Sequence, residues 1–261
     1  MIGRVLHGVV IAALFAFLLA PVVLVLPMSF SADTFLIWPP SGFSLRWYAA
    51  LWGETKLMEA ARSSFFLALL VCAVTLVLAM PAALVLARGR FAGREALVAL
   101  LTAPLLLPTI VLALALLILF VGYGLIGSWS GLVLAHLLVA LPYGIRVLMT
   151  AVSTLPASVE EAASSLGAPP WAVFRRVTLP LMLPGVAATA AIVFLVSFDE
   201  VVISLFVVGP ELTTLPVAMF RYVESRTDPL VAAVSALLVM LTLGIVVVLE
   251  RAVGLGRALG R

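Results

Sequence analysis

The sequence predicts an all-α integral membrane protein with six transmembrane helices. Of its 261 residues, 65% are hydrophobic and only 10% are charged, whereas a soluble domain is about half apolar and a quarter charged. This composition cannot cover a surface that faces water. Uncharged stretches also follow one another along the chain, and about 20 helical residues suffice to cross the hydrocarbon core of a bilayer.

These uncharged stretches mark the expected spans in order. The first lies between Arg4 and Asp33, and the second between Arg62 and Arg88. Residues 96–145 form one uncharged stretch of 50 residues. It would make about 75 Å of helix, more than twice the membrane thickness, so the chain must fold back within it. The expected spans are residues 9–27, 63–87, 97–121, 130–150, 183–208 and 229–249.

Turn and cap residues are expected to bound the later spans. Residues 122–129 contain three glycines, a tyrosine and a tryptophan, which suits a turn at the membrane interface. Gly209 and Pro210 close the fifth span. Asp228 is expected to cap the sixth span, with Pro229 at its first helical position.

Loop charges predict the orientation. Six spans put both termini on one side, and ten of the fifteen Lys and Arg residues fall on that side. The positive-inside rule therefore places both termini in the cytoplasm, with the spans in contact with membrane lipid. A signal peptide is the alternative for residues 9–27. That run is longer than the usual h-region and lacks a small-x-small cleavage site, so we expect a retained helix.

Several kinds of site are not expected. Cys72 is the single cysteine, which excludes an internal disulfide and a multi-cysteine metal site. His136 has no second ligand at metal-binding spacing, so packing within the fourth span is expected for it and no metal site is predicted. No basic cluster with interleaved aromatic residues is present, so nucleic acid is not an expected partner.

Residues 155–180, between the fourth and fifth spans, are expected to form two short cytoplasmic helices. Ser158 and Glu161 have the spacing of a capping box, and Gly167 is a stop signal after the first helix. A proline pair opens the second helix and Pro180 closes it. The apolar side chains of this second helix recur at helical spacing and are expected to bury against a partner: Trp171, Phe174 and Val177.

A signature then appears in the same segment. Glu161-Ala162-Ala163, Gly167 and Val177-x-Leu179-Pro180 resemble the E-A-A-x-x-x-G-x(9)-I-x-L-P pattern of ABC importer permeases, with Val177 in place of the usual Ile. Other segments resemble the spermidine/putrescine branch of that family: 44–48, 197–200, 209–210, 214–216 and 228–229. The resemblance covers nearly the whole chain and implies the MetI-like fold of a type I importer permease in the bacterial inner membrane.

The resemblance implies that residues 155–180 contain a coupling helix that docks in a cleft of a cytoplasmic ATPase subunit. The residues expected to act in coupling are Glu160, Glu161, Ala162, Ala163, Gly167, Trp171, Phe174, Leu179 and Pro180. The implied partners are a pair of ABC ATPase subunits, a second and different permease chain, and a solute-binding protein. The alternative is a loop that packs only on itself.

The chain has no G-x-x-x-x-G-K-[ST] loop. We therefore expect ATP and Mg to be bound by the ATPase subunit, and this chain to be a transport subunit without catalytic residues or cofactors of its own. An ion-coupled secondary carrier and an intramembrane hydrolase are the alternative classes. The first would show a second half related by a repeat, and the second an activated nucleophile with a base.

Asp199 and Glu200 interrupt the fifth span near mid-membrane, where ionisable groups usually face a bundle interior or a water-filled cavity. In a continuous helix, Glu200 shares a polar stripe with Ser197 and Ser204. These four residues are the expected substrate pathway, with Glu200 facing it more than Asp199, for which pairing with a neighbouring helix is the alternative. Carboxylates would favour a cation, in agreement with the polyamine-type resemblance. Alternatively, they hydrogen-bond between helices or hold a gate with the partner permease.

The two longest outer loops carry apolar and aromatic residues. Trp38, Trp47, Tyr48 and Trp52 cluster in the first, and a short segment with apolar residues at helical spacing follows Pro216 in the last. Contact with a solute-binding protein and contact with the lipid interface are both compatible with this pattern.

Overall fold

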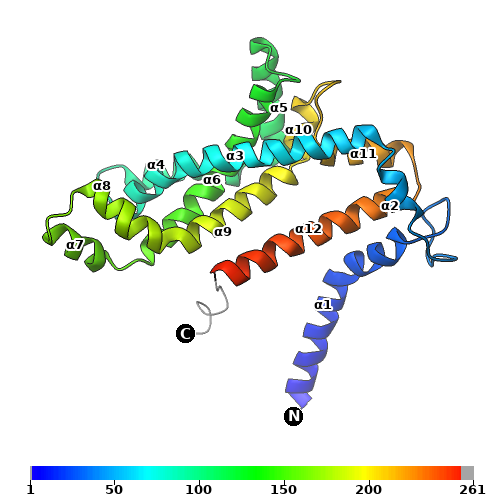
Figure 1. The fold of residues 1–261 in the computed structure, drawn as a ribbon, viewed down its shortest axis with the longest axis horizontal. Helices are drawn as coiled ribbons and strands as arrows, with labels where there is room; N and C mark the ends of the chain where they lie inside the picture. Colours follow the sequence, from blue (N-terminus) through cyan, green and yellow to red (C-terminus); the bar gives the residue numbers. More distant parts are fainter. Residues whose placement is uncertain (1, 254–261) are drawn as a thin grey trace. The chain divides into compact units, whose positions relative to one another are not determined.

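The computed structural model describes residues 2–253. Within that range the chain is helical, and its extended pairing is a single isolated bridge between Ser31 and Phe43. The helical elements in chain order are α1 (Ile2–Ser29), α2 (Arg46–Leu51), α3 (Thr55–Arg88), α4 (Arg94–Thr102), the 3₁₀ turn η1 (Ala103–Leu106), α5 (Thr109–Tyr123), α6 (Trp129–Ser153), α7 (Ala157–Ser165), α8 (Pro170–Val173), the π turn η2 (Phe174–Thr178), α9 (Leu179–Phe198), α10 (Val202–Val207), α11 (Leu215–Ser225) and α12 (Leu230–Val253) (Figure 1).

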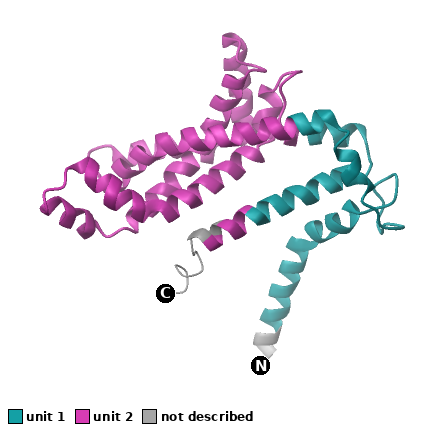
Figure 2. Ribbon diagram, viewed as in Figure 1, with its two compact units in different colours: residues 1–59, 218–244 teal, residues 60–217, 245–261 magenta. Residues whose placement is uncertain are grey.

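Five helices in the described range are long and apolar enough to cross a membrane, and one bent pair makes a sixth if it counts as one span. The all-α membrane fold expected from composition is therefore confirmed. The chain divides into two compact units, residues 1–59 with 218–244 and residues 60–217 with 245–261 (Figure 2). The unit that contains α5 to α10 holds the site described below.

The expected span 97–121 is divided among α4, η1 and α5, and the two arms meet at 97°. Leu107, at the corner, has extended backbone with ψ 142°. The cause is Pro108, because a proline disfavours the helical conformation in the residue before it and lacks an N–H for the helix ladder. Pro81 and Pro142, in contrast, stay inside α3 and α6.

α6 is the central helix of the second unit. Its first half, around Leu132 and Ala140, joins a buried apolar cluster with α5, α9 and α10. Its second half, around Ile145 and Leu148, joins another cluster with α3 and α9. α6 and α3 approach closely at Gly144, where a Cβ atom would come within 2.5 Å of the Thr75 methyl group. Small residues at such crossings allow helices in membranes to pack tightly.

In the first unit, polar contacts organise the loop after α1. The hydroxyl and the N–H of Ser41 donate to the carboxylate of Asp33, as does the hydroxyl of Ser31. These hydrogen bonds, with those from Ser41 the strongest, hold the pKa of Asp33 below its ordinary value. Asp228 accepts a hydrogen bond from the N–H of Leu230 at 3.1 Å, which confirms its side chain as a cap, although α12 begins at Leu230 and not at the expected Pro229.

Candidate functional site

The segment 155–180 contains the first of the two expected short helices, α7, but not the expected capping box. Pro156 occupies the N-cap position, and no side chain caps the helix. The prediction for Ser158 is wrong because α7 begins at Ala157, one residue before it. Its hydroxyl therefore lies inside the first turn rather than before it.

α7 ends as the sequence predicts. Gly167 has φ +85°, in the left-handed region. Its N–H donates to Ser164 O at 2.9 Å, and the N–H of Ala168 donates to Ala163 O at 3.2 Å. This pair of bonds is the Schellman motif, which satisfies the last carbonyl groups of a helix and favours glycine at the left-handed position.

The second expected helix does not end at Pro180. α8 passes through the π turn η2 into α9, so that residues 170–198 form one apolar helix of 29 residues. The prediction of a stop at Pro180 is wrong because this proline lies in the first turn of α9, directly after the wider π turn, where its missing N–H is tolerated. α8 is therefore continuous with a membrane span.

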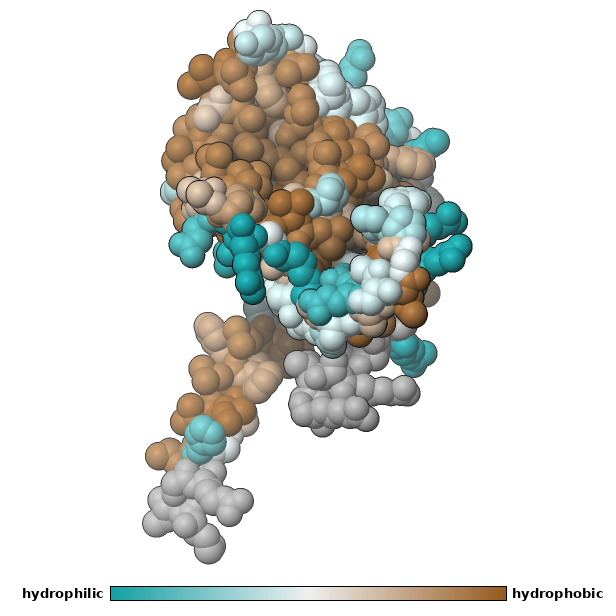
Figure 3. Space-filling view, turned by 90° about the vertical axis from the view of Figure 1, so that its left-hand side faces the viewer, coloured by the Kyte–Doolittle hydropathy of each residue, from teal (hydrophilic) through white to brown (hydrophobic). Residues whose placement is uncertain are grey.

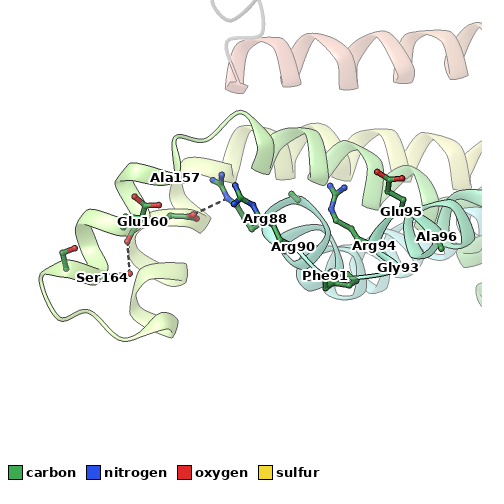
Figure 4. A pocket seen from close by; sticks show the side chains of 14 residues that line it. Arg88, Arg90, Phe91, Gly93, Arg94, Glu95, Ala96, Ala157, Glu160 and Ser164 are labelled. Atoms are coloured by element: carbon green, nitrogen blue, oxygen red, sulfur yellow. Dashed lines mark hydrogen bonds and ion pairs between the residues drawn. The ribbon is translucent and has the colours of Figure 1, made fainter.

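Glu160 links α7 to two membrane-spanning helices. Its Oε2 lies 3.4 Å from the Nε of Arg88, the last residue of α3. Its Oε1 accepts a hydrogen bond at 2.7 Å from Thr178, which is buried at the base of α9. Arg88 also donates to Leu155 O at 2.9 Å. The carboxylate of Glu160 therefore joins the end of α3 to the base of α9, and its contact with Arg88 is drawn in Figure 4.

Other residues of the segment are directed outward. The side chain of Glu161 is exposed and makes no hydrogen bond or ion pair within the part of the chain that the structure describes. Trp171 is 67% exposed, and its ring lies 5.6 Å from that of Phe174, which is half-buried. The remaining residues expected to act in coupling have small or apolar side chains; Ala162, Gly167 and Pro180 are exposed, and Ala163 and Leu179 are half-buried.

A cleft of about 1320 Å³ lies between α7 and the loop that joins α3 to α4. Three arginines line it from the loop side, Arg88, Arg90 and Arg94, while Glu160 and Glu161 line it from α7 (Figure 4). Figure 3, which views the α7 end, shows hydrophilic side chains gathered beside broad apolar surface. From the sequence these arginines were expected only as charges of a cytoplasmic loop, although their close spacing within residues 88–94 indicates a basic cluster.

The two acids of the fifth span lie at a break rather than within a continuous helix. α9 ends at Phe198 and α10 begins at Val202. Oε1 of Glu200 accepts a hydrogen bond from the N–H of Ile203 at 2.9 Å and so caps α10. Asp199 is exposed, whereas Glu200 is half-buried. The expectation that Glu200 faces the pathway more than Asp199 assumed an unbroken helical period, which this break interrupts, and it stays a prediction.

The expected polar stripe is also absent, since Ser197 and Ser204 face the interior. Ser197 is 4% exposed and Ser204 is 0% exposed. Both bind His136 of α6, with Ser197 Oγ 2.9 Å from Nδ1 and Ser204 Oγ 3.0 Å from Nε2. Within residues 2–253 no group of three or more potential ligands is placed to hold a metal ion.

Known proteins are similar to this chain in sequence over most of its length. Residues 76–253 match the family described as "Binding-protein-dependent transport system inner membrane component". The chain is 33% identical to the spermidine/putrescine transport system permease protein PotC of Escherichia coli (strain K12), over 95% of this chain and 93% of that protein. It is 34% identical to the putrescine transport system permease protein PotI of the same strain, over 86% of this chain and 82% of that protein.

Two solved structures share the fold. One is a bacterial ABC transporter involved in the import of the acidic polysaccharide alginate, with a TM-score of 0.70 and 16% identity over 96% of this chain and 95% of that chain. The other is the MetNI methionine ABC transporter, with a TM-score of 0.62 and 22% identity over 78% of this chain and 96% of that chain. At these identities the likeness concerns the fold.

Proposed function

Because the chain belongs to the family of binding-protein-dependent transport system inner membrane components, we propose that it is the permease subunit of an ATP-driven importer of polyamines. The substrate class is supported by two relatives above 30% identity whose names specify spermidine and putrescine or putrescine. We further propose that the chain has no catalytic activity itself, and that separate ATPase subunits bind ATP and Mg.

The observation that carries this proposal is the construction of the segment 155–180. α7 is a short helix that projects beyond the spans, presents Glu161 outward, and is bonded through Glu160 to α3 and α9. A rigid element of this kind can pass a rigid-body movement of a partner to the spans. We propose that a cytoplasmic ATPase subunit holds α7, with Glu161 and the exposed Trp171 at the contact, and that both termini are therefore cytoplasmic. The other partners are a second, different permease chain and a solute-binding protein.

The test is uptake by the complete complex in proteoliposomes. With ATP on one side and the binding protein and radiolabelled putrescine or spermidine on the other, uptake should require ATP and no ion gradient. The variants Glu161→Ala and Gly167→Ala should each reduce uptake while ATP hydrolysis continues. Undiminished uptake in both variants would exclude this role for the segment, and uptake driven by an ion gradient without ATP would support a secondary carrier instead.

We propose that Asp199 and Glu200 contribute the cation preference of the pathway. Asp199 stands exposed at the break of the span, and Glu200 lies beside it. A carboxylate at such depth is retained where it meets water or a charged partner. Asp199→Asn should reduce uptake more than Glu200→Gln, because the amide of glutamine still offers an oxygen to cap α10. Unchanged uptake of both polyamines by both variants would assign the acids to a structural role.

A further inference from the structure

The buried imidazole of His136 is bonded to both sides of the helix break. His136 lies on α6 and is 1% exposed. Its Nδ1 reaches Ser197, in the last turn of α9, and its Nε2 reaches Ser204, in the first turn of α10. Among the described residues it is the one side chain hydrogen-bonded to both helices. A neutral imidazole has one donor and one acceptor, so the two serine hydroxyls satisfy it fully.

The far end of α10 is fixed independently of this imidazole. The N–H of Gly127 donates to Val207 O at 2.8 Å. Gly127 also lies against Gly209, where a Cβ atom on Gly209 would come within 2.8 Å of the Gly127 Cα atom. Ile203 and Val207 are fully buried in the cluster shared with α5. α10 is therefore held at its end and along its apolar side, and residues 199–201 are the short segment that joins it to α9.

We propose that His136 is a positioning residue of the translocation pathway. By bonding Ser197 and Ser204 it sets the distance and direction between the two helix ends, and so determines where Asp199 and the α10-capping Glu200 stand. The inference rests on the proposed function only in naming the pathway these acids serve. His136 itself touches neither acid by a hydrogen bond within the described residues, so its effect on transport is indirect.

Two variants of His136 distinguish the effect of its hydrogen bonds from the effect of its side-chain volume. His136→Leu removes both bonds and leaves two buried hydroxyl groups without their partner, so ATP-dependent uptake should fall by at least about fivefold. His136→Gln keeps one donor and one acceptor and should retain more than about half of the uptake. Thr189→Val is the matched control, because Thr189 is a buried hydroxyl of α9 that bonds only to its own helix, at Gly185 O. Its uptake should stay within about twofold.

A double variant provides a second test, because two substitutions that remove the same hydrogen bond should not have additive effects on uptake. Ser204→Ala alone should reduce uptake, but in a His136→Leu background it should change uptake by less than about twofold, because the bond it removes is already lost. Full additivity, wild-type uptake in His136→Leu, or equal loss in His136→Gln and His136→Leu would each overturn the proposal. If His136→Leu does not co-purify with its partner subunits, Ser204→Ala decides, since it leaves the ring volume in place, and wild-type uptake there also overturns it.

Hydrogen exchange of the α10 amides provides a measurement that does not depend on the solute. Exchange of residues 203–207 in the purified complex should accelerate by about fivefold or more in His136→Leu and remain near wild type in His136→Gln and Thr189→Val. A wild-type complex without ATP-dependent uptake of either polyamine would contradict the proposed function alone, because the exchange measurement still tests the bracing by His136. Unchanged exchange in His136→Leu would contradict the bracing by His136 alone.

Discussion

Replacement of Glu160 or of its neighbour Glu161 by alanine should affect α7 very differently. The two acids are adjacent in the first turns of α7, so the gain in helix propensity and the loss of the favourable helix-dipole interaction are similar in both variants. They differ in contacts, because Glu160 binds Arg88 and Thr178 while Glu161 is exposed. The pair of variants therefore isolates the contribution of these contacts.

The expected magnitude follows from the two contacts. A hydrogen bond from the buried Thr178 hydroxyl to a charged carboxylate contributes about 1.5–3 kcal/mol. The ion pair with Arg88 is partly solvated, at 31% and 23% side-chain exposure, and contributes about 0.5 kcal/mol. Glu160→Ala should thus destabilise the bound position of α7 by about 2 kcal/mol, a factor of roughly thirty in its equilibrium.

Hydrogen exchange measures this equilibrium directly, because protected amides exchange from locally opened states. In Glu160→Ala the amides of residues 161–165 should exchange about thirtyfold faster, and in Glu161→Ala within about twofold of the wild-type rate. Glu160→Gln should fall between them, since its amide oxygen still accepts from Thr178. Equal acceleration in Glu160→Ala and Glu161→Ala would refute the assignment of Glu160 as the link between α7 and the spans.

Three further predictions concern the backbone and the outer loop. Gly167→Ala should destabilise the end of α7 by about 1 kcal/mol, because φ +85° strains an L-residue even though a Cβ atom there would meet no atom within 4 Å. Gly167→Asn should cause a smaller destabilisation, and amide exchange of α7 measures both effects. Gly209→Ala should destabilise the second unit by more than about 2 kcal/mol in thermal unfolding, because the new Cβ atom would clash with Gly127. Gly124→Ala is the control: at φ +65°, with no atom within 4 Å of the new Cβ atom, it should cost only about 1 kcal/mol of backbone strain. The pKa of Asp33 is lowered in the fold, so its stabilising effect is complete above the ordinary aspartate pKa and is lost as the pH falls through the lowered value. Amide exchange of residues 31–44, corrected for intrinsic rates, should therefore rise in that acidic window, and Asp33→Asn should abolish this pH dependence.

The local signals in the sequence determined a substantial part of this protein. Charge-free stretches predicted a helical membrane protein because the bilayer requires apolar helices of a fixed minimum length. Gly167 predicted the end of α7, since a left-handed residue at that position depends on the local backbone alone. Asp228 likewise identified the start of α12 through a contact two residues away. Each of these features is decided within one helical turn or by the surrounding solvent.

The tertiary structure decided the features that depend on distant residues. The helical period predicted that Glu200, Ser197 and Ser204 share one face, but that period holds only while the helix is unbroken. The helix is broken at residues 199–201, and the serines on either side of the break bond to His136, which lies more than 60 residues earlier in the chain. Likewise, both Glu160 and Glu161 were expected to act in coupling, and no local signal indicated which of the two would bind the spans. Only the packing of α3 and α9 brings Arg88 and Thr178 to one acid and leaves the other exposed, because helix pairing in space, unlike helix formation, is not encoded in any short stretch of sequence.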